Sequence, residues 1–329
     1  MMSPSRRSVL AAGIAAVSTT GFAAARKTAN SSGARPSLAG PHLDLMTPEG
    51  SARAYARIAG SLNPEVTSYS WYSGRVSGHR PGEAGRDLMR IIGMGAVRLL
   101  PLQGEMGWTM LRKELGFFVD LESGAVIDRW RNPYLDEEVE VVHLANPAIN
   151  STIKAYVREQ GLYEAAGAPE KTKPFQLPWL QVGDRAMTEL HAHIRARNPL
   201  DPAKWPRESS GAQISISDAN SFNVALADLQ NPALEKVESS GSWVHSRPWQ
   251  PWMLMGQAEG HIQYTCFTGS SAGLDRMPPQ IVALARARYP DFLEAPREIT
   301  RAESSLARYM RTRSPKPPLL QPPTAMPVR

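Results

Sequence analysis

The sequence predicts an α+β protein whose mainly antiparallel sheet closes into a barrel-like core flanked by short helices. Hydrophobic and polar residues alternate in many short runs between residues 96 and 268, as they do in strands with one buried face. Turn-forming residues separate these runs. The chain lacks both a regular strand–helix alternation and a glycine-rich phosphate loop, which argues against a parallel α/β sheet.

The composition is that of a folded chain with a buried core. Of the 329 residues, 42% are hydrophobic and 21% are charged, which excludes a largely disordered or fibrous protein. We expect a single α+β domain over residues 47–313 and a proline-rich disordered tail over 314–329. No repeat of fixed period is present, so solenoids and propellers are not expected.

The N-terminus predicts export. Residues 1–25 combine Arg6 and Arg7, a weakly apolar run and the small residues 23–25, which together are typical of a twin-arginine signal peptide. The run is too polar for a membrane-spanning helix, and no cysteine stands directly after it where a lipid could be attached. No stable membrane anchor is therefore expected. We therefore expect recognition by the twin-arginine (Tat) export machinery, a periplasmic or secreted location, and a flexible linker over residues 26–46.

The charge pattern excludes one class of partner. The formal net charge is +6, which falls to +4 when Arg6 and Arg7 are left out. The other basic residues are interleaved with acidic ones and form no basic stripe, so a nucleic-acid partner is not expected. Cys266 is the sole cysteine, so an internal disulfide is impossible.

Five helices are expected. Thr47 as N-cap and Pro48 at the first helical position begin the first, and residues 81–93 have the spacing of a second. Residues 149–162 predict a third, which interrupts the strands, and residues 278–289 a fourth. Thr300 and Glu303 are placed as a capping box for one more C-terminal helix.

The strands are predicted from alternation with period two. Residues 115–121 and 125–130 form a hairpin around the turn at 122–124. Further runs with strand spacing are 139–144, 185–197, 213–218, 222–228, 237–247 and 261–268. Asn-Pro pairs begin at residues 132, 146, 198 and 231, each after an extended run, and we interpret them as breaks between strands.

Two catalytic motifs occur without the residues that would complete them. Residues 269–273 spell G-x-S-x-G around Ser271, but no histidine follows it, as a serine hydrolase of that type requires. Residues 151–154 spell S-x-x-K, but the companion motifs of penicillin-interacting enzymes are missing. Neither motif supports a function.

The strongest candidate site lies on the strand at 185–197. Glu189, His191 and His193 occupy alternate positions, so their side chains share one face, and small apolar residues occupy the other. If a helix packs on the apolar face from outside, the Glu-His-His face looks into the barrel. The alternative is an ordinary strand with its polar side in water.

Further histidines and one arginine are expected to face inward from other strands. His143 and His245 share strand faces with valine and tryptophan side chains, and Arg247 follows His245 on the same face. Histidines that converge in a cavity can exchange protons near neutral pH. The His-x-His pair also suits zinc or iron, although the spacing alone does not establish a metal site.

A second feature is aromatic. Trp243, Trp249 and Trp252 cluster in a segment broken by Pro248 and Pro251, and Trp130 joins them as a candidate. The segment either closes one end of the barrel or forms the wall of a pocket for an apolar or aromatic ligand.

Four strings resemble one known family. They are ELGFFVD at 114–120, WRNP at 130–133, NPLDPAKWPRESSG at 198–211 and WQPWMLMG at 249–256. Over about residues 45–313 the chain resembles the family catalogued as domain of unknown function 1838. The resemblance implies no activity, cofactor or catalytic residues, because none is established for the family. Members often carry export signals, which agrees with the twin-arginine interpretation.

The leading hypothesis is an exported protein whose barrel encloses a pocket for a small apolar or aromatic molecule. Chemistry there would be proton transfer, as in a hydratase, isomerase or lyase. Catalytic candidates are Glu189, His191, His193, His143, His245 and Arg247; substrate-binding candidates are Trp130, Trp243, Trp249 and Trp252. Alternatives are a binding protein without turnover and a metal enzyme that uses His191 and His193; the cofactor is unknown.

Overall fold

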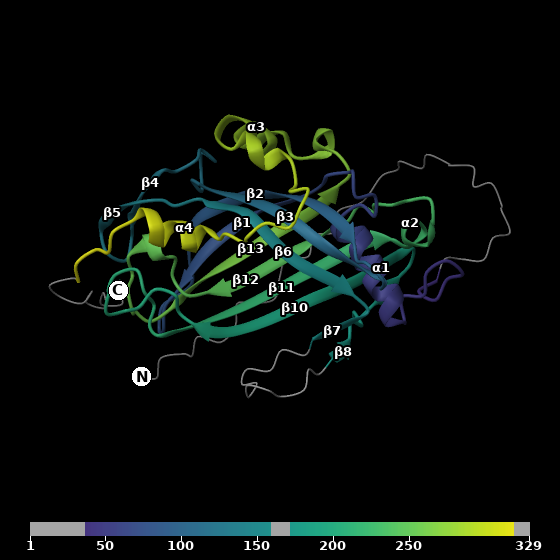
Figure 1. Ribbon diagram of the computed structural model, residues 1–329. Coiled ribbons are helices and arrows are strands. Elements are labelled where there is room, and N and C mark those ends of the chain that lie inside the picture. Colours follow the sequence, from purple (N-terminus) through teal and green to yellow (C-terminus); the bar gives the residue numbers. More distant parts are fainter. Residues whose placement is uncertain (1–36, 159–171, 319–329) are drawn as a thin grey trace, which may run out of the picture. The chain divides into compact units, whose positions relative to one another are not determined.

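The computed structural model describes residues 37–158 and 172–318 (Figure 1). The expected signal peptide over 1–25 lies outside these residues, as do part of the expected linker and residues 319–329 of the expected tail. In the described ranges no helix is both long and apolar enough to cross a membrane.

One antiparallel sheet of nine strands dominates the fold and curls strongly into a half-barrel (Figure 1). In spatial order its strands are β6 (Leu144–Lys154), β3 (Gly107–Val119), β2 (Arg86–Pro101), β1 (Ser68–His79), β13 (His261–Ser271), β12 (Ser240–Arg247), β11 (Gln213–Ala225), β10 (Arg185–Arg197) and β9 (Leu180–Val182). Short two-stranded pairs are β4 (Arg129–Asn132) with β5 (Glu137–Glu140) and β7 (Tyr156–Arg158) with β8 (Thr172–Pro174). The predicted mainly antiparallel, barrel-like architecture is confirmed as a half-barrel, in which the edge strands β6 and β9 do not pair with each other to close the sheet.

Short helices accompany the sheet. They are α1 (Pro48–Ala59), α2 (Leu226–Gln230), α3 (Pro279–Arg288) and α4 (Ser305–Thr312), with single 3-10 turns η1 (Pro251–Met253), η2 (Leu274–Arg276) and η3 (Pro290–Leu293). In α1 the Thr47 hydroxyl accepts a hydrogen bond from the Gly50 N–H at 3.0 Å, as expected of its N-cap. The predicted helix at 278–289 is α3.

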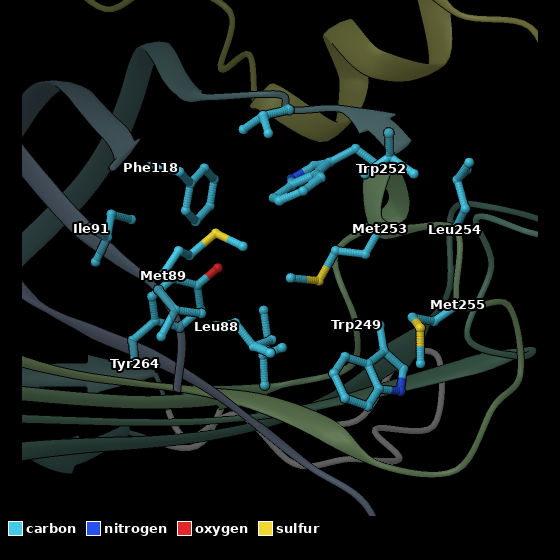
Figure 2. Packing of buried hydrophobic residues seen from close by; sticks show 14 of the residues in the cluster. Leu88, Met89, Ile91, Phe118, Trp249, Trp252, Met253, Leu254, Met255 and Tyr264 are labelled. Atoms are coloured by element: carbon cyan, nitrogen blue, oxygen red, sulfur yellow. The ribbon is translucent and has the colours of Figure 1, made fainter. Parts of the chain in front are cut away.

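The inner face of the sheet is filled at one end by the tryptophan segment. Trp249, Trp252 and Met253 are buried against strand residues that include Met89 and Phe118 (Figure 2). The Trp252 and Phe118 ring centroids lie 5.2 Å apart. Of the two interpretations offered by the sequence, closure of one end describes this segment.

Helix α1 covers the other end of the inner face. Its Ala52 and Ala56 pack with Val97 and Leu99 of β2, and its Ala54 and Ile58 belong to a cluster with residues of β10, β11 and α2. Helix α3 packs on the outer face, in a cluster with alternate residues of β2 such as Ile92 and Met94. The inner face is thus covered at both ends, with space between.

Several predicted elements differ from the structure. Residues 81–93 were expected to be helical, but β2 runs from Arg86 to Pro101, because a long run of buried residues fits a strand covered on both faces as well as a helix. The helix expected at 149–162 is wrong over the described residues, since β6 runs to Lys154 and β7 covers Tyr156–Arg158, while residues 159–162 lie outside the described ranges. The Asn-Pro pair at 146 lies inside β6, which tolerates proline as an edge strand.

Three further differences concern missed or shifted elements. Strand β1 was not predicted, because its serines and glycines obscure the alternation. Helix α4 is capped by Ser304, not by Thr300. Residues 37–46 do not form a free linker, since Leu45 is fully buried and the Leu43 carbonyl accepts a hydrogen bond from Gln230 at 2.7 Å.

Two glycines make room for a buried tyrosine on the inner face. Gly93 of β2 lies between Tyr72 of β1 and Gly116 of β3 in the strand register. The Tyr72 hydroxyl donates to the Leu115 carbonyl at 2.9 Å. A Cβ atom at Gly93 would lie 2.2 Å from the Tyr72 ring and 2.3 Å from the Leu115 oxygen.

We therefore predict that Gly93→Ala lowers the free energy of unfolding by about 1–3 kcal/mol, because the tyrosine ring has to move. Urea unfolding followed by circular dichroism measures the change. Ser73→Ala, on the opposite face of β1, serves as the control and should shift stability by less than about 0.5 kcal/mol. Equal unfolding midpoints for Gly93→Ala and the wild type would contradict this packing.

Candidate functional site

A cavity of about 420 Å³ lies on the inner face of the sheet, between the two covered ends. Helix α1 supplies Tyr55, Ile58 and Ala59 to its lining. The strand residues that matter below are Tyr72, Arg112, Glu114, Leu190, Asp218, Asn220, Phe222, Ser239, Trp243, His245 and Ser270. Both aromatic and charged side chains therefore line one partly open cavity.

Aromatic rings form much of the apolar wall. The Tyr55 and Phe222 ring centroids lie 5.9 Å apart in an edge arrangement, and Tyr72 and Trp243 lie 5.1 Å apart in another. Edge-to-face pairs are a favourable packing mode for aromatic side chains. The wall of the cavity is therefore partly aromatic.

An Asp218–His245 pair lies in this wall. The two residues are direct partners in the register of β11 and β12, which places their side chains on the same face. His245 Nδ1 lies 3.3 Å from Asp218 Oδ1, and the same oxygen accepts a hydrogen bond from Trp243 Nε1. The carboxylate therefore holds both a histidine and a tryptophan in position.

The charge state of Asp218 determines which ring nitrogen of His245 carries the proton. Burial raises the pKa of Asp218, but hydrogen bonds from His245 and Trp243 and the charge of Arg112 outweigh it, so the pKa lies below the ordinary value. An ionised carboxylate only accepts hydrogen bonds, so Nδ1 of His245 carries the proton toward it. Nε2 makes no hydrogen bond to any residue that the structure describes, and in neutral imidazole it is a proton acceptor.

A second charged pair lies on β3. Arg112 and Glu114 form an ion pair at 2.7 Å, and Asn146 donates to Glu114 at 2.9 Å. The charge of Glu114 raises the pKa of Arg112 above its ordinary value. The Arg112 Nε atom is buried and has no hydrogen-bond partner among residues 37–158 and 172–318, whereas the side chain as a whole is 33% exposed and lines the cavity.

The predicted Glu189-His191-His193 face points away from the cavity. Leu190, on the other face of β10, lines the cavity and pairs with Asn220 in the register. The side chains of Glu189 and His191 are 56% and 48% exposed and lie 3.3 Å apart. The prediction that the Glu-His-His face looks into the barrel is therefore wrong. A helix does cover the apolar side of this strand, but that helix is α1, which packs on the inner face of the curled sheet and not on its outside.

The other predicted catalytic residues are dispersed. His143 is buried beside Phe117 and Phe118, where its Nδ1 accepts the Phe118 N–H at 3.1 Å and its Nε2 lies 3.2 Å from Asp128. It does not line the cavity, and burial lowers its pKa. Arg247 lines a separate open depression of about 540 Å³ with His193. His245 alone of the six lines the inner cavity.

The predicted tryptophans also separate. Trp243 lines the cavity, whereas Trp249 and Trp252 are core residues and Trp130 packs on Trp252 with ring centroids 5.9 Å apart. Sequence reasoning missed Arg112, Glu114 and Asp218. The alternation of side chains along β3 could have indicated Arg112 and Glu114. These two charged residues lie on the same face of the strand as Gly116 and Phe118, and that face is otherwise apolar.

The structure gives no support for a metal centre. Within the described ranges, no group of three or more histidine, cysteine, aspartate or glutamate side chains is placed to hold a metal ion. Cys266 is buried, and burial raises the pKa of its thiol to about 12, so the thiolate form needed for a nucleophile or ligand is disfavoured.

Asp218→Asn should lower the free energy of unfolding at pH 7 by about 1–2 kcal/mol, because charged hydrogen bonds contribute that much. The folded pKa lies below the ordinary value of 3.8, so this stabilisation is present above about pH 4 and is lost as the pH falls through the folded pKa. Urea unfolding of both proteins between pH 7 and pH 3 measures the difference. The exposed Asp184→Asn is the control; a difference that stays constant with pH would contradict the assigned charge state.

Comparison with known proteins agrees with the sequence resemblance. The family described as "Protein of unknown function (DUF1838)" matches residues 65–313, which include every strand that lines the cavity. No curated protein matches the chain. Because the match covers most of the 329 residues, the chain belongs to the DUF1838 family.

Proposed function

We propose that the inner cavity binds a small, partly aromatic molecule and that His245 transfers a proton to or from it. The observation that carries the proposal is the hydrogen bond from His245 Nδ1 to Asp218, within a wall of aromatic rings. This contact orients the imidazole and leaves Nε2 as the proton acceptor. The reaction class is that of an isomerase, hydratase or lyase, which moves a proton on carbon.

Each residue of the site has a separate role in this reaction. His245 is the general base, Asp218 stabilises the imidazolium that forms, and Trp243 holds Asp218 by its indole N–H. Arg112, from β3, lines the cavity and supplies a positive charge for a carbonyl or enolate oxygen of the ligand. Tyr55 and Phe222 provide the apolar wall.

We test this with 2-tetralone, a ketone with one aromatic ring and acidic protons beside its carbonyl. In D₂O the wild type should exchange these protons for deuterium, as measured by mass spectrometry. His245→Gln should reduce the exchange by at least about 100-fold, because it removes the base. His42→Gln, a histidine on an exposed segment, is the matched control.

The outcomes separate the rival functions. Binding of 2-tetralone, detected by ligand-observed NMR, without exchange would identify a binding protein that has no turnover. Exchange that depends on His191 and His193 would instead favour the outer face of β10. A wild-type protein that neither binds nor exchanges the ketone refutes the proposal.

We also propose that the chain is exported through the twin-arginine route to the periplasm or beyond. The support is the arginine pair with the apolar run and small residues that follow it. Replacing Arg6 and Arg7 together by lysine should leave the protein in the cytoplasm, because the pair is what the machinery reads. Cell fractionation measures this, with Arg26→Lys as the control outside the signal; unchanged export of the double variant contradicts the route.

A further inference from the structure

A lysine lies behind the α1 end of the cavity, in the segment before β12. The Lys236 Nζ lies 2.5 Å from the Ile58 carbonyl oxygen, 3.0 Å from the Val237 carbonyl oxygen and 2.9 Å from the Ser270 hydroxyl. It is thus surrounded by three oxygens, two of the backbone and one of a side chain that lines the cavity.

A pair of serines connects this lysine to the cavity. Ser239 and Ser270 both line it, and their hydroxyl oxygens lie 3.0 Å apart. The Ser239 backbone N–H also donates to Ser270 Oγ at 3.1 Å. Ser270 Oγ therefore has three partners, whereas Ser239 Oγ has Ser270 as its one partner among the described residues.

The number of hydrogen bonds fits a neutral lysine. A neutral amine has two N–H donors, which serve the two carbonyls, and one lone pair, which accepts the Ser270 proton. Ser270 Oγ then accepts from the Ser239 N–H and from the Ser239 hydroxyl, so every donor and acceptor is used. Protonation of Lys236 reverses both hydroxyl hydrogen bonds: the amine then donates to Ser270 Oγ, Ser270 donates to Ser239 Oγ, and the Ser239 hydroxyl proton has no acceptor among the described residues.

The surroundings also favour the neutral form near neutral pH. Burial lowers the pKa of Lys236 to about 7, although Glu238 raises it. Glu238 is ion-paired with Arg276 at 2.7 Å. Arg57 of α1 is engaged by backbone carbonyls, including those of Leu229 and Leu234. Among the described residues, no carboxylate forms a hydrogen bond or an ion pair with the Lys236 amine.

We propose that Ser239 is a nucleophile, activated by Lys236 through Ser270, and that the cavity takes carboxylic esters of small acids. The inference rests on the proposed function in one respect, that a small molecule enters this cavity. His245 lies six residues further along β12, about 20 Å away, so it acts at the other end of the cavity.

The reaction balances without a cofactor. Ser239 Oγ bonds to the ester carbonyl carbon while its proton passes to Ser270 and the Ser270 proton passes to Lys236. The ester C–O bond breaks, and the leaving alkoxide takes the proton from Lys236 through the Ser270 hydroxyl, because Ser239 Oγ is now acylated. Water then attacks the acyl carbon while its proton passes through Ser270 to Lys236. The bond between Ser239 Oγ and the acyl carbon breaks, Ser239 Oγ takes that proton back through Ser270, and the acid is released.

A fluorophosphonate probe tests the assignment, since attack by a serine oxygen breaks its P–F bond and leaves a stable adduct. Peptide mass spectrometry should find the adduct on Ser239, with a rate that rises as the pH passes through about 7. Lys236→Arg keeps donors for the carbonyls but cannot release its proton, so we expect labelling to fall at least about 100-fold. Ser270→Ala should cause a similar loss.

The controls keep this test apart from the preceding one. Ser271→Ala, at the neighbouring serine of the G-x-S-x-G string, should label as the wild type does. Thermal melting and 2-tetralone binding verify that each variant is folded with an open cavity. Absence of an adduct in a wild type that binds 2-tetralone, or an adduct that persists in Ser239→Ala, overturns the nucleophile and leaves the proposed function standing.

Discussion

An antiparallel sheet that curls but does not close has to bury its inner face against other parts of the chain. Here two segments far apart in the sequence share that task, α1 at one end and residues 248–255 at the other. Each of the two segments packs in a buried apolar cluster of its own. The cavity is what remains between them, so its size and position follow from how the half-barrel is filled.

This arrangement explains why charged side chains can line an otherwise apolar space. An isolated buried charge is costly, so Asp218, Arg112 and Glu114 persist because each has hydrogen-bond or ionic partners. These partners also limit what each group can do. Asp218 remains ionised and only accepts hydrogen bonds, and Glu114 is already bound by Arg112 and Asn146. His245 keeps one ring nitrogen, Nε2, without a hydrogen bond to any described residue. At the α1 end of the cavity, Lys236, Ser239 and Ser270 form a second group of polar side chains that hydrogen-bond to one another.

The sequence predicts the class of fold well and the orientation of one strand poorly. Strand alternation is a local property, so the antiparallel sheet, the capped helix α1 and the export signal could all be proposed from residues close together in the chain. Which face of β10 points inward depends on where α1 packs, and no pattern within the strand itself shows this. Strand β2 was missed for a related reason: other parts of the chain bury both of its faces, so its sequence lacks the alternation that identifies a strand.

The candidate site was only partly predictable for related reasons. His245 and Trp243 were found by parity within one strand, but Asp218 and Arg112 come from strands whose adjacency depends on the sheet order. Lys236 and Ser270 are separated by 34 residues and meet through a side-chain hydrogen bond. Contacts of this kind require the register of several strands at once.

A crystal structure of the protein soaked with 2-tetralone would show where a ligand binds on the sheet. We expect electron density for the ketone between Tyr55, Trp243 and His245, with its oxygen toward Arg112. Density on the outer face of β10, or an inner cavity whose side chains have collapsed together and hold only water, would contradict this expectation.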